Sequence, residues 1–315
     1  TSASLWVGIG VSILLTLPCI AFAYQIAGVF GLNENTTRMA AEFIQVLALF
    51  NISFAVNMVF GAALRAAGDA KTPLWIGVLM NIINVFLVYG LVFGAFGLPQ
   101  LGTLGAALAS GLSLTVSAAV LIGLWYTRKL RVDVGGRGSF TWLRVKQLYQ
   151  IGYPAAVEQF VFQLGFIGFL WLVASYGTEP YAAYGIGVQI LSLSFVVGFG
   201  FSIAGATLVG QHLGAQEPEA AERQGWRATR LAIGSMVAMS LIIMLFAEEV
   251  SRYLIDDDLV VHYTVIFIYI LGLAQPLMGI EFTLSGCLRG AGDTRYPRLA
   301  TMVGLIGIRV GLAAV

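Results

Sequence analysis

Nine long apolar stretches constrain this chain more than any other feature of its sequence. They are 18 to 29 residues long, and an α-helix needs about 20 residues to cross about 30 Å of hydrocarbon. Only 10% of the residues are charged, whereas soluble domains carry about 25%, so the chain cannot cover a folded core with polar groups. We therefore predict an all-α integral membrane protein with nine transmembrane helices. The stretches lie approximately at residues 5–30, 41–64, 74–97, 104–126, 151–176, 181–209, 228–246, 262–288 and 298–315.

The 17 Lys and Arg residues are divided unevenly between the two sides of the predicted membrane. If successive loops alternate sides, Arg38 and Arg252 lie on one side and Arg309 lies inside the last stretch. All the others fall in loops on the opposite side. Cytoplasmic loops carry the excess of Lys and Arg. The side with the basic loops is therefore predicted to be cytoplasmic, in a multi-pass protein of the cell membrane.

A ten-residue sequence occurs twice, at an offset of 224 residues. Residues 64–73 read LRAAGDAKTP and residues 288–297 read LRGAGDTRYP, and each joins two apolar stretches on the basic side. Equivalent stretches are six helices apart, so the two copies have the same orientation, as in a parallel duplication. We expect a piece of a 6+6 two-lobe transporter, cut at both ends. Residues 1–126 are a partial first lobe of four helices, 127–150 a cytoplasmic linker, and 151–315 a partial second lobe of five helices.

The repeated loop itself has a structural interpretation. Gly68 and Gly292 are expected to end one helix, and Pro73 and Pro297 to begin the next. The Arg and Asp side chains of the loop are expected to cap helix ends or to pair at the surface.

Three further segments carry distinctive small and polar residues. Residues 104–107 read LGAA, 151–159 read IGYPAAVEQ and 209–215 read VGQHLGA. Together with the repeated LRxAGDxxxP loop, they resemble the multidrug and toxic compound extrusion (MATE) family, and within it the DinF-like prokaryotic branch. The resemblance implies alternating-access export of drugs or small organic metabolites, driven by proton or sodium entry and without a cofactor.

Two acidic residues lie inside predicted transmembrane helices, Glu158 and Glu281. A charged side chain at the membrane centre costs about 2.5 to 3.5 kcal/mol on insertion scales, so it usually faces a cavity or a partner. Either glutamate could take up and release a proton as its exposure changes. Alternatively, each is a structural carboxylate, held by hydrogen bonds to Gln159, Gln163 or a neighbouring helix.

Other polar residues inside the apolar stretches complete the predicted cavity. Asn81 and Asn84 share a helix face and could line the cavity, coordinate a cation, or form interhelical hydrogen bonds. Arg309 lies deep in the last stretch, where it could pair with one of the two glutamates or repel cations as part of a gate. Gln189 and Gln275 are lesser candidates for cavity lining.

The predicted function is secondary active efflux by proton- or sodium-coupled antiport. A flippase for a lipid-linked saccharide is the alternative within the same superfamily. A flippase for anionic headgroups should have several cationic residues in its cavity, whereas only Arg309 lies deep inside an apolar stretch, and this disfavours the alternative. A passive channel is also compatible with the repeat. An enzyme is not expected, because His212 and His262 lie at helix ends and no Asp lies inside an apolar stretch. The expected partners of the monomer are the lipid bilayer and a small organic substrate, which can be cationic, with no nucleic acid.

Glu158→Gln should weaken proton-dependent efflux and leave folding intact, because an amide cannot exchange a proton. Transport by reconstituted vesicles at several pH values measures this effect. An unchanged pH dependence would remove Glu158 from the mechanism.

Overall fold

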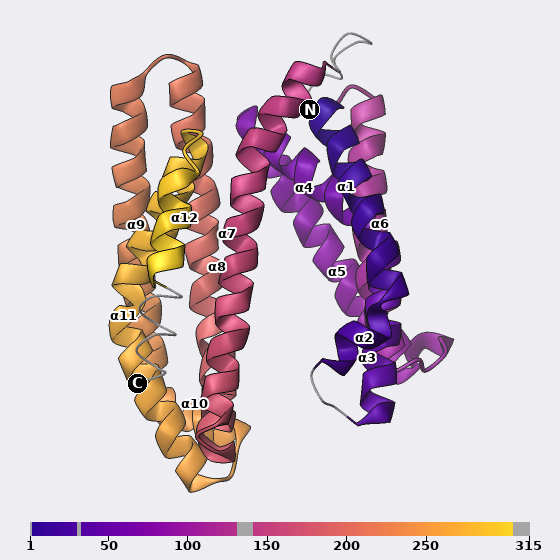
Figure 1. The fold of residues 1–315 in the computed structure, drawn as a ribbon, viewed down its shortest axis with the longest axis vertical. Helices are drawn as coiled ribbons and strands as arrows, with labels where there is room; N and C mark the ends of the chain where they lie inside the picture. The colour runs from indigo at the N-terminus through magenta and orange to yellow at the C-terminus, as the bar shows by residue number, and fades with distance from the viewer. Residues whose placement is uncertain (1, 30–32, 131–140, 305–315) are drawn as a thin grey trace. The chain divides into compact units, whose positions relative to one another are not determined.

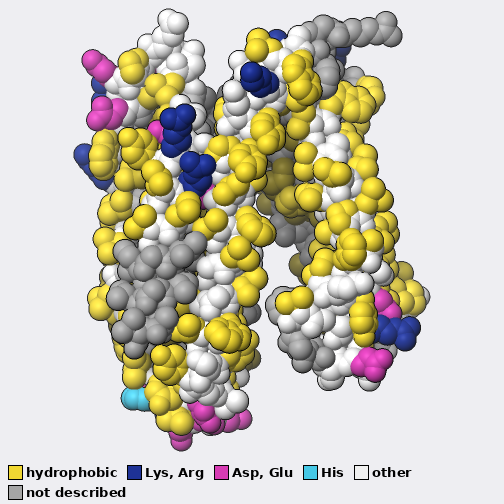
Figure 2. All heavy atoms as spheres, viewed as in Figure 1, with side chains coloured by type: hydrophobic (Ala, Val, Ile, Leu, Met, Phe, Trp, Pro, Cys, Tyr) yellow, Lys and Arg dark blue, Asp and Glu magenta, His cyan; other side chains and the backbone are white. Residues whose placement is uncertain are grey.

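The computed structural model of this chain describes residues 2–29, 33–130 and 141–304, which are helical apart from short connections (Figure 1). It divides into two compact units, Thr1–Leu148 (unit 1) and Tyr149–Val315 (unit 2). Inside hydrocarbon no water is available to hydrogen-bond the backbone, so a helix, which satisfies its own amide groups, is the form expected for each apolar stretch. Figure 2 shows hydrophobic side chains along the visible length of each unit.

The helices follow one another with short loops. Unit 1 contains α1 (Ser2–Ala21), α2 (Ala23–Gly28), α3 (Glu34–Leu49), α4 (Asn51–Ala66), α5 (Lys71–Phe93), the 3-10 helix η1 (Ala95–Gly97) and α6 (Thr103–Tyr126). Six further helices are α7 (Trp142–Ala174), α8 (Thr178–Gly214), α9 (Pro218–Leu245), α10 (Ala247–Leu254), α11 (Asp258–Gly290) and α12 (Arg295–Thr301). Helix α7 begins before the boundary between the units and continues into unit 2.

Seven of the described helices are each long and apolar enough to cross a membrane, namely α1, α5, α6, α7, α8, α9 and α11. Helices α3 and α4 together form one further candidate, bent by 51° at their junction. These helices fall on the first eight predicted stretches. The ninth, 298–315, lies mostly outside the described residues, which include only its beginning in α12. The all-helical membrane fold is thus confirmed, whereas the number of nine transmembrane helices is not.

The bend between α3 and α4 is fixed by contacts with two other helices. Phe50, at the junction, leaves helical geometry with φ −96° and ψ 6°. Its ring packs directly on Gly111 of α6, where an added Cβ would overlap the ring. The Thr16 hydroxyl of α1 donates to Ala48 O at 3.1 Å and accepts from Asn51 Nδ2 at 3.2 Å. One hydroxyl therefore bonds to both sides of the break.

The two copies of the repeat have the same local backbone. Helix α1 breaks at Phe22, with φ −108° and ψ 15°, and α9 breaks at Phe246, with φ −106° and ψ 18°. These two residues are 224 positions apart, the offset of the repeat. Gly68 and Gly292 have φ of 81° and 84°, in the left-handed region that glycine tolerates. Each follows the end of a helix, as predicted.

Side-chain hydrogen bonds repeat at the same offset. Thr16 of α1 donates to Ala48 O, and Ser240 of α9 donates to Gly272 O of α11 at 2.8 Å. Both residues of the second bond lie 224 positions after those of the first. The duplication read from the sequence is therefore preserved in an interhelical contact.

The aspartate of each repeated loop caps the following helix. Asp69 Oδ1 accepts from the backbone N–H of Thr72 at 3.0 Å, and its Oδ2 accepts from the Thr72 hydroxyl at 2.6 Å. Asp293 Oδ1 accepts from the backbone N–H of Arg295 at 2.9 Å. The predicted capping role of the two aspartates is confirmed.

Small residues let α11 pack closely against α8 in unit 2. An added Cβ at Gly286 would overlap the backbone of Ser202, and one at Gly290 would overlap that of Ala206. Close backbone approach through small residues is typical of membrane helices, where lipid removes the hydrophobic drive for association. Helix α9 packs against both, so that α8, α9 and α11 form the core of unit 2.

Gly111→Ala is expected to destabilise unit 1 by about 1 to 3 kcal/mol, because the new methyl group displaces the Phe50 ring. Gly123→Ala on the same helix is the matched control, since no atom lies within 4 Å of its added Cβ. Gly123→Ala should leave the stability unchanged or raise it slightly, because Ala has a higher helix propensity than Gly. Melting temperatures of the detergent-purified variants test the prediction, and equal effects of the two changes would contradict it.

Candidate functional site

The buried carboxylate of α7 is paired with an arginine of α11. Arg289 Nη1 donates to Glu158 Oε1 at 2.9 Å, with the two side chains 35% and 10% exposed. Arg289 Nη2 also donates to Ser202 Oγ of α8, at 3.5 Å. The predicted surface role is therefore wrong for Arg289, whose long side chain reaches a carboxylate that would otherwise be buried without a counter-charge. The pair links three helices of unit 2.

The partners predicted for Glu158 are not those observed. Gln159 and Gln163 are exposed on α7, and no described hydrogen bond joins either to Glu158. Arg309, the predicted ion-pair partner, lies outside the described residues. Glu158 Oε2 is buried and has no hydrogen-bond partner among the described residues.

Glu281 of α11 has a different environment. Its side chain is exposed and lines a pocket of about 430 Å³ between α11 and α12. In the described part of the chain, no ion pair or hydrogen bond joins Glu281 to another side chain. Arg289 and Glu158 lie close enough for their charges to act on it. The other lining residues are mostly apolar and include Leu284, Leu288, Tyr296, Pro297, Leu299 and Val303.

Asn81 and Asn84 of α5 do not converge on one ligand site in unit 1. Asn84 Nδ2 lies 3.4 Å from the hydroxyl oxygens of Ser110 and Ser113 on α6. Asn81 is exposed and donates to Gly77 O of its own helix at 2.9 Å. The geometry of Asn84 therefore fits the interhelical hydrogen-bond alternative.

Asn57 of α4 is a well-connected polar side chain that the sequence analysis missed. Its amide donates to Ser53 O at 2.8 Å and to Leu114 O of α6 at 2.9 Å. Its Oδ1 accepts from the hydroxyl of Ser117. The repeat could have found it, because Asn57 lies 224 positions before Glu281. Equivalent positions in the two copies thus hold a fully bonded amide and a carboxylate without a described partner.

The two glutamines predicted to line a cavity in unit 2 differ in exposure. Gln189 of α8 is exposed. Gln275 of α11 is fully buried, and neither atom of its amide has a hydrogen-bond partner among the described residues. The prediction of cavity lining is therefore wrong for Gln275, because α11 is enclosed there by its packing against α8 and α9.

Replacing one member of the Glu158–Arg289 pair should destabilise the protein more than replacing both. Breaking a buried ion pair costs about 3 to 5 kcal/mol, and we expect less here because Arg289 is 35% exposed. Glu158→Gln should therefore lower the melting temperature, which revises the expectation that it leaves folding intact. The combined Glu158→Gln and Arg289→Gln change should recover most of the loss. Melting temperatures of the unaltered protein, the two single variants and the double variant form a double-mutant cycle. If the losses of the two single variants add up in the double variant, the two residues are not coupled.

Comparison with known proteins identifies the family. The MatE family model matches residues 1–90 and 154–315. A probable multidrug resistance protein NorM from Thermotoga maritima is 35% identical over 288 residues, which cover 90% of this chain and 61% of that protein. Another probable NorM, from Burkholderia pseudomallei, is 32% identical over 312 residues, which cover 96% and 67%. The chain therefore spans about two thirds or less of these relatives' lengths.

Solved structures show the same fold. A MOP superfamily transporter from Pyrococcus furiosus matches with a TM-score of 0.91 at 21% identity, covering 99% of this chain and 70% of that one. A MATE structure in complex with MaD3S matches with a TM-score of 0.88, also at 21% identity, covering 98% and 69%. The family is one of multi-pass transporters of the cell membrane and not of enzymes. This chain belongs to the MATE family.

Proposed function

We propose that this chain is the core of a secondary active exporter that releases drugs or small organic molecules in exchange for protons or sodium ions. Its membership of the MATE family and the names of its relatives support this proposal. We propose further that the two units belong to two lobes of a monomer, which open a cavity alternately to the two sides of the membrane. Residues 127–150 would link the lobes on the cytoplasmic side.

The environment of Glu281 is the observation that carries the proposal. A carboxylate on a membrane-spanning helix needs a cation, a proton or water. Glu281 has no described ion-pair partner and lines a mostly apolar pocket. Tyr296 and Leu288 in the same pocket supply surface for an aromatic or aliphatic body. An amphipathic organic cation, with its charge at Glu281, fits this combination.

Competition for one carboxylate can couple the two fluxes. A proton or sodium ion on Glu281 must leave before an organic cation binds there, and the organic cation must leave before the ion returns. One charge that enters across about 100 mV releases about 2.3 kcal/mol. This free energy sustains a substrate gradient of roughly fifty-fold.

The Glu158–Arg289 pair has a supporting role in this proposal. While Glu158 is ionised it balances the charge of Arg289, which lies close enough to act on Glu281. Protonation of Glu158 would leave Arg289 unbalanced and weaken cation binding at Glu281. Glu158 therefore stays a proposed coupling residue, acting through Arg289.

Other exposed polar side chains on membrane-spanning helices can contribute to the cavity lining. We propose this role for Gln159, Gln163, Gln189 and Asn81, which are all exposed. Arg309 stays a proposed partner or gate residue, outside the described part of the chain. A flippase for lipid-linked saccharides is not favoured, because the relatives are multidrug resistance proteins by name.

Glu281→Gln is expected to reduce coupled efflux of an organic cation by roughly tenfold or more, because the amide neither holds a cation nor exchanges a proton. Vesicles reconstituted with the full-length protein and loaded with ethidium, under separate proton and sodium gradients, measure the effect and identify the ion. Collapse of accumulation by an uncoupler separates a transporter from a channel.

Glu222→Gln, an exposed residue of α9, is the control and should leave efflux unchanged. Both variants should keep the melting temperature of the unaltered protein, since Glu281 makes no described ion pair. Full ion-coupled efflux by Glu281→Gln would contradict the assigned role of this carboxylate.

A further inference from the structure

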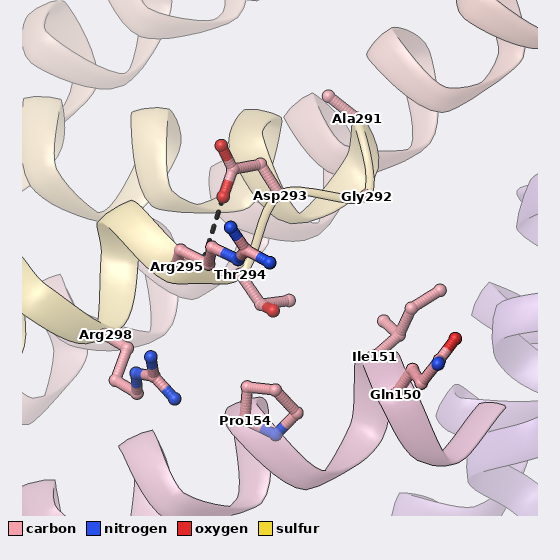
Figure 3. A pocket seen from close by; sticks show the side chains of 9 residues that line it. All are labelled: Gln150, Ile151, Pro154, Ala291, Gly292, Asp293, Thr294, Arg295 and Arg298. Atoms are coloured by element: carbon pink, nitrogen blue, oxygen red, sulfur yellow. Dashed lines mark hydrogen bonds between the residues drawn. The ribbon is translucent and has the colours of Figure 1, made fainter. Parts of the chain in front are cut away.

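We propose that unit 2 binds the phosphate of an anionic phospholipid headgroup in a second pocket, between α7 and α12. The pocket has a volume of about 700 Å³. Gln150, Ile151 and Pro154 of α7 line one side, and Thr294, Arg295 and Arg298 line the other (Figure 3). The pocket contains neither Glu281 nor Glu158.

The charges around this pocket favour an anion. Arg295 and Arg298 form no ion pair with an acidic residue in the described part of the chain. Asp293 is the one acidic lining residue, and its Oδ1 is engaged by the backbone N–H of Arg295. A guanidinium group presents a planar fork of donors that matches two phosphate oxygens. Two such groups, with the Gln150 amide and the Thr294 hydroxyl as further donors, suit a phosphodiester.

Exposed tyrosines place the pocket at the level of lipid headgroups. Tyr149 and Tyr153 of α7, on either side of Gln150 in sequence, are 65% and 55% exposed, and their rings stack with centroids 5.5 Å apart. Tyr296, beside Arg295, is 67% exposed. Tyrosine is enriched where a membrane protein meets the membrane–water interface. This position favours a lipid headgroup as the ligand over a free phosphate ion from bulk water.

The position of the pocket is typical of a lipid site. Basic pockets between membrane-spanning helices on the cytoplasmic side bind anionic headgroups. Figure 2 shows Lys and Arg side chains gathered toward the end of unit 2 at which α12 begins. This is the end that the distribution of basic loops predicts to be cytoplasmic.

A headgroup in this pocket would attach α7 to the rest of unit 2. Pro154 is one helical turn before Glu158, and Asp293 is four residues after Arg289. The pocket therefore lies next to the ion pair that joins α7 to α11. A phosphate held between Gln150 and Arg298 would join α7 to α12, so binding should raise the melting temperature.

The test uses the full-length protein, purified and delipidated in detergent. Phosphatidylglycerol, phosphatidylcholine and inorganic phosphate are titrated separately, with the melting temperature and retention of lipid in native mass spectrometry as readouts. The test variant combines Arg295→Gln with Arg298→Gln. The matched control combines Arg227→Gln with Arg230→Gln, which removes two exposed charges from α9 at the same end of unit 2.

Phosphatidylglycerol should stabilise the unaltered protein and the control, and the test variant should bind it at least about tenfold more weakly. Arg298→Lys, which keeps the charge and loses the planar fork, should give an intermediate affinity. Without lipid, the unaltered protein, the test variant and the control variant should have the same melting temperature. Equal weakening in test and control variants, equal stabilisation by inorganic phosphate, or no stabilisation by phosphatidylglycerol would overturn the proposal.

Discussion

Inside a membrane, the polar groups of the backbone must find hydrogen-bond partners within the protein, and the structure depends on this constraint. It makes each apolar stretch a helix, and it governs the places where a helix is interrupted. The break at Phe50 occurs where the Thr16 hydroxyl bonds to groups on both sides of it. The equivalent hydroxyl in the second copy, that of Ser240, bonds to the equivalent carbonyl, that of Gly272. Such contacts hold helices together where lipid offers no hydrophobic drive for association.

The same constraint separates the two intramembrane carboxylates. Glu158 is paired within the fold, because Arg289 supplies a counter-charge to its Oε1 and the same guanidinium group bonds to Ser202. Glu281 makes no ion pair with a described residue and lines a mostly apolar pocket. A buried ion pair costs free energy to break, whereas a carboxylate without a counter-charge can accept a cation or a proton. On this difference rests the proposal that Glu281 binds the ion or the substrate directly, whereas Glu158 acts through Arg289.

The features that could be predicted from the sequence are those that depend only on the order of residues along the chain. Helix length, the basic loops and the offset of 224 residues are all visible without knowledge of packing. Arg289 and Glu158 are 131 positions apart, and only the tertiary fold brings the long Arg289 side chain within reach of α7. The burial of Gln275 likewise depends on two other helices that enclose it. Asn57 could have been found from the repeat, which aligns it with Glu281. Two of its three hydrogen bonds, however, depend on the approach of α6.

The duplication places different polar groups at one equivalent position of the two copies, Asn57 and Glu281. In the first copy Asn57 is neutral and bonded on both its nitrogen and its oxygen, so α4 and α6 are held together there. In the second copy the close approach of α8 and α11 at Gly286 and Gly290 supplies cohesion by backbone packing. The side chain of Glu281 is then not needed to join helices. The proposed transport role of Glu281 therefore falls at a position whose equivalent in the first copy is held by interhelical hydrogen bonds.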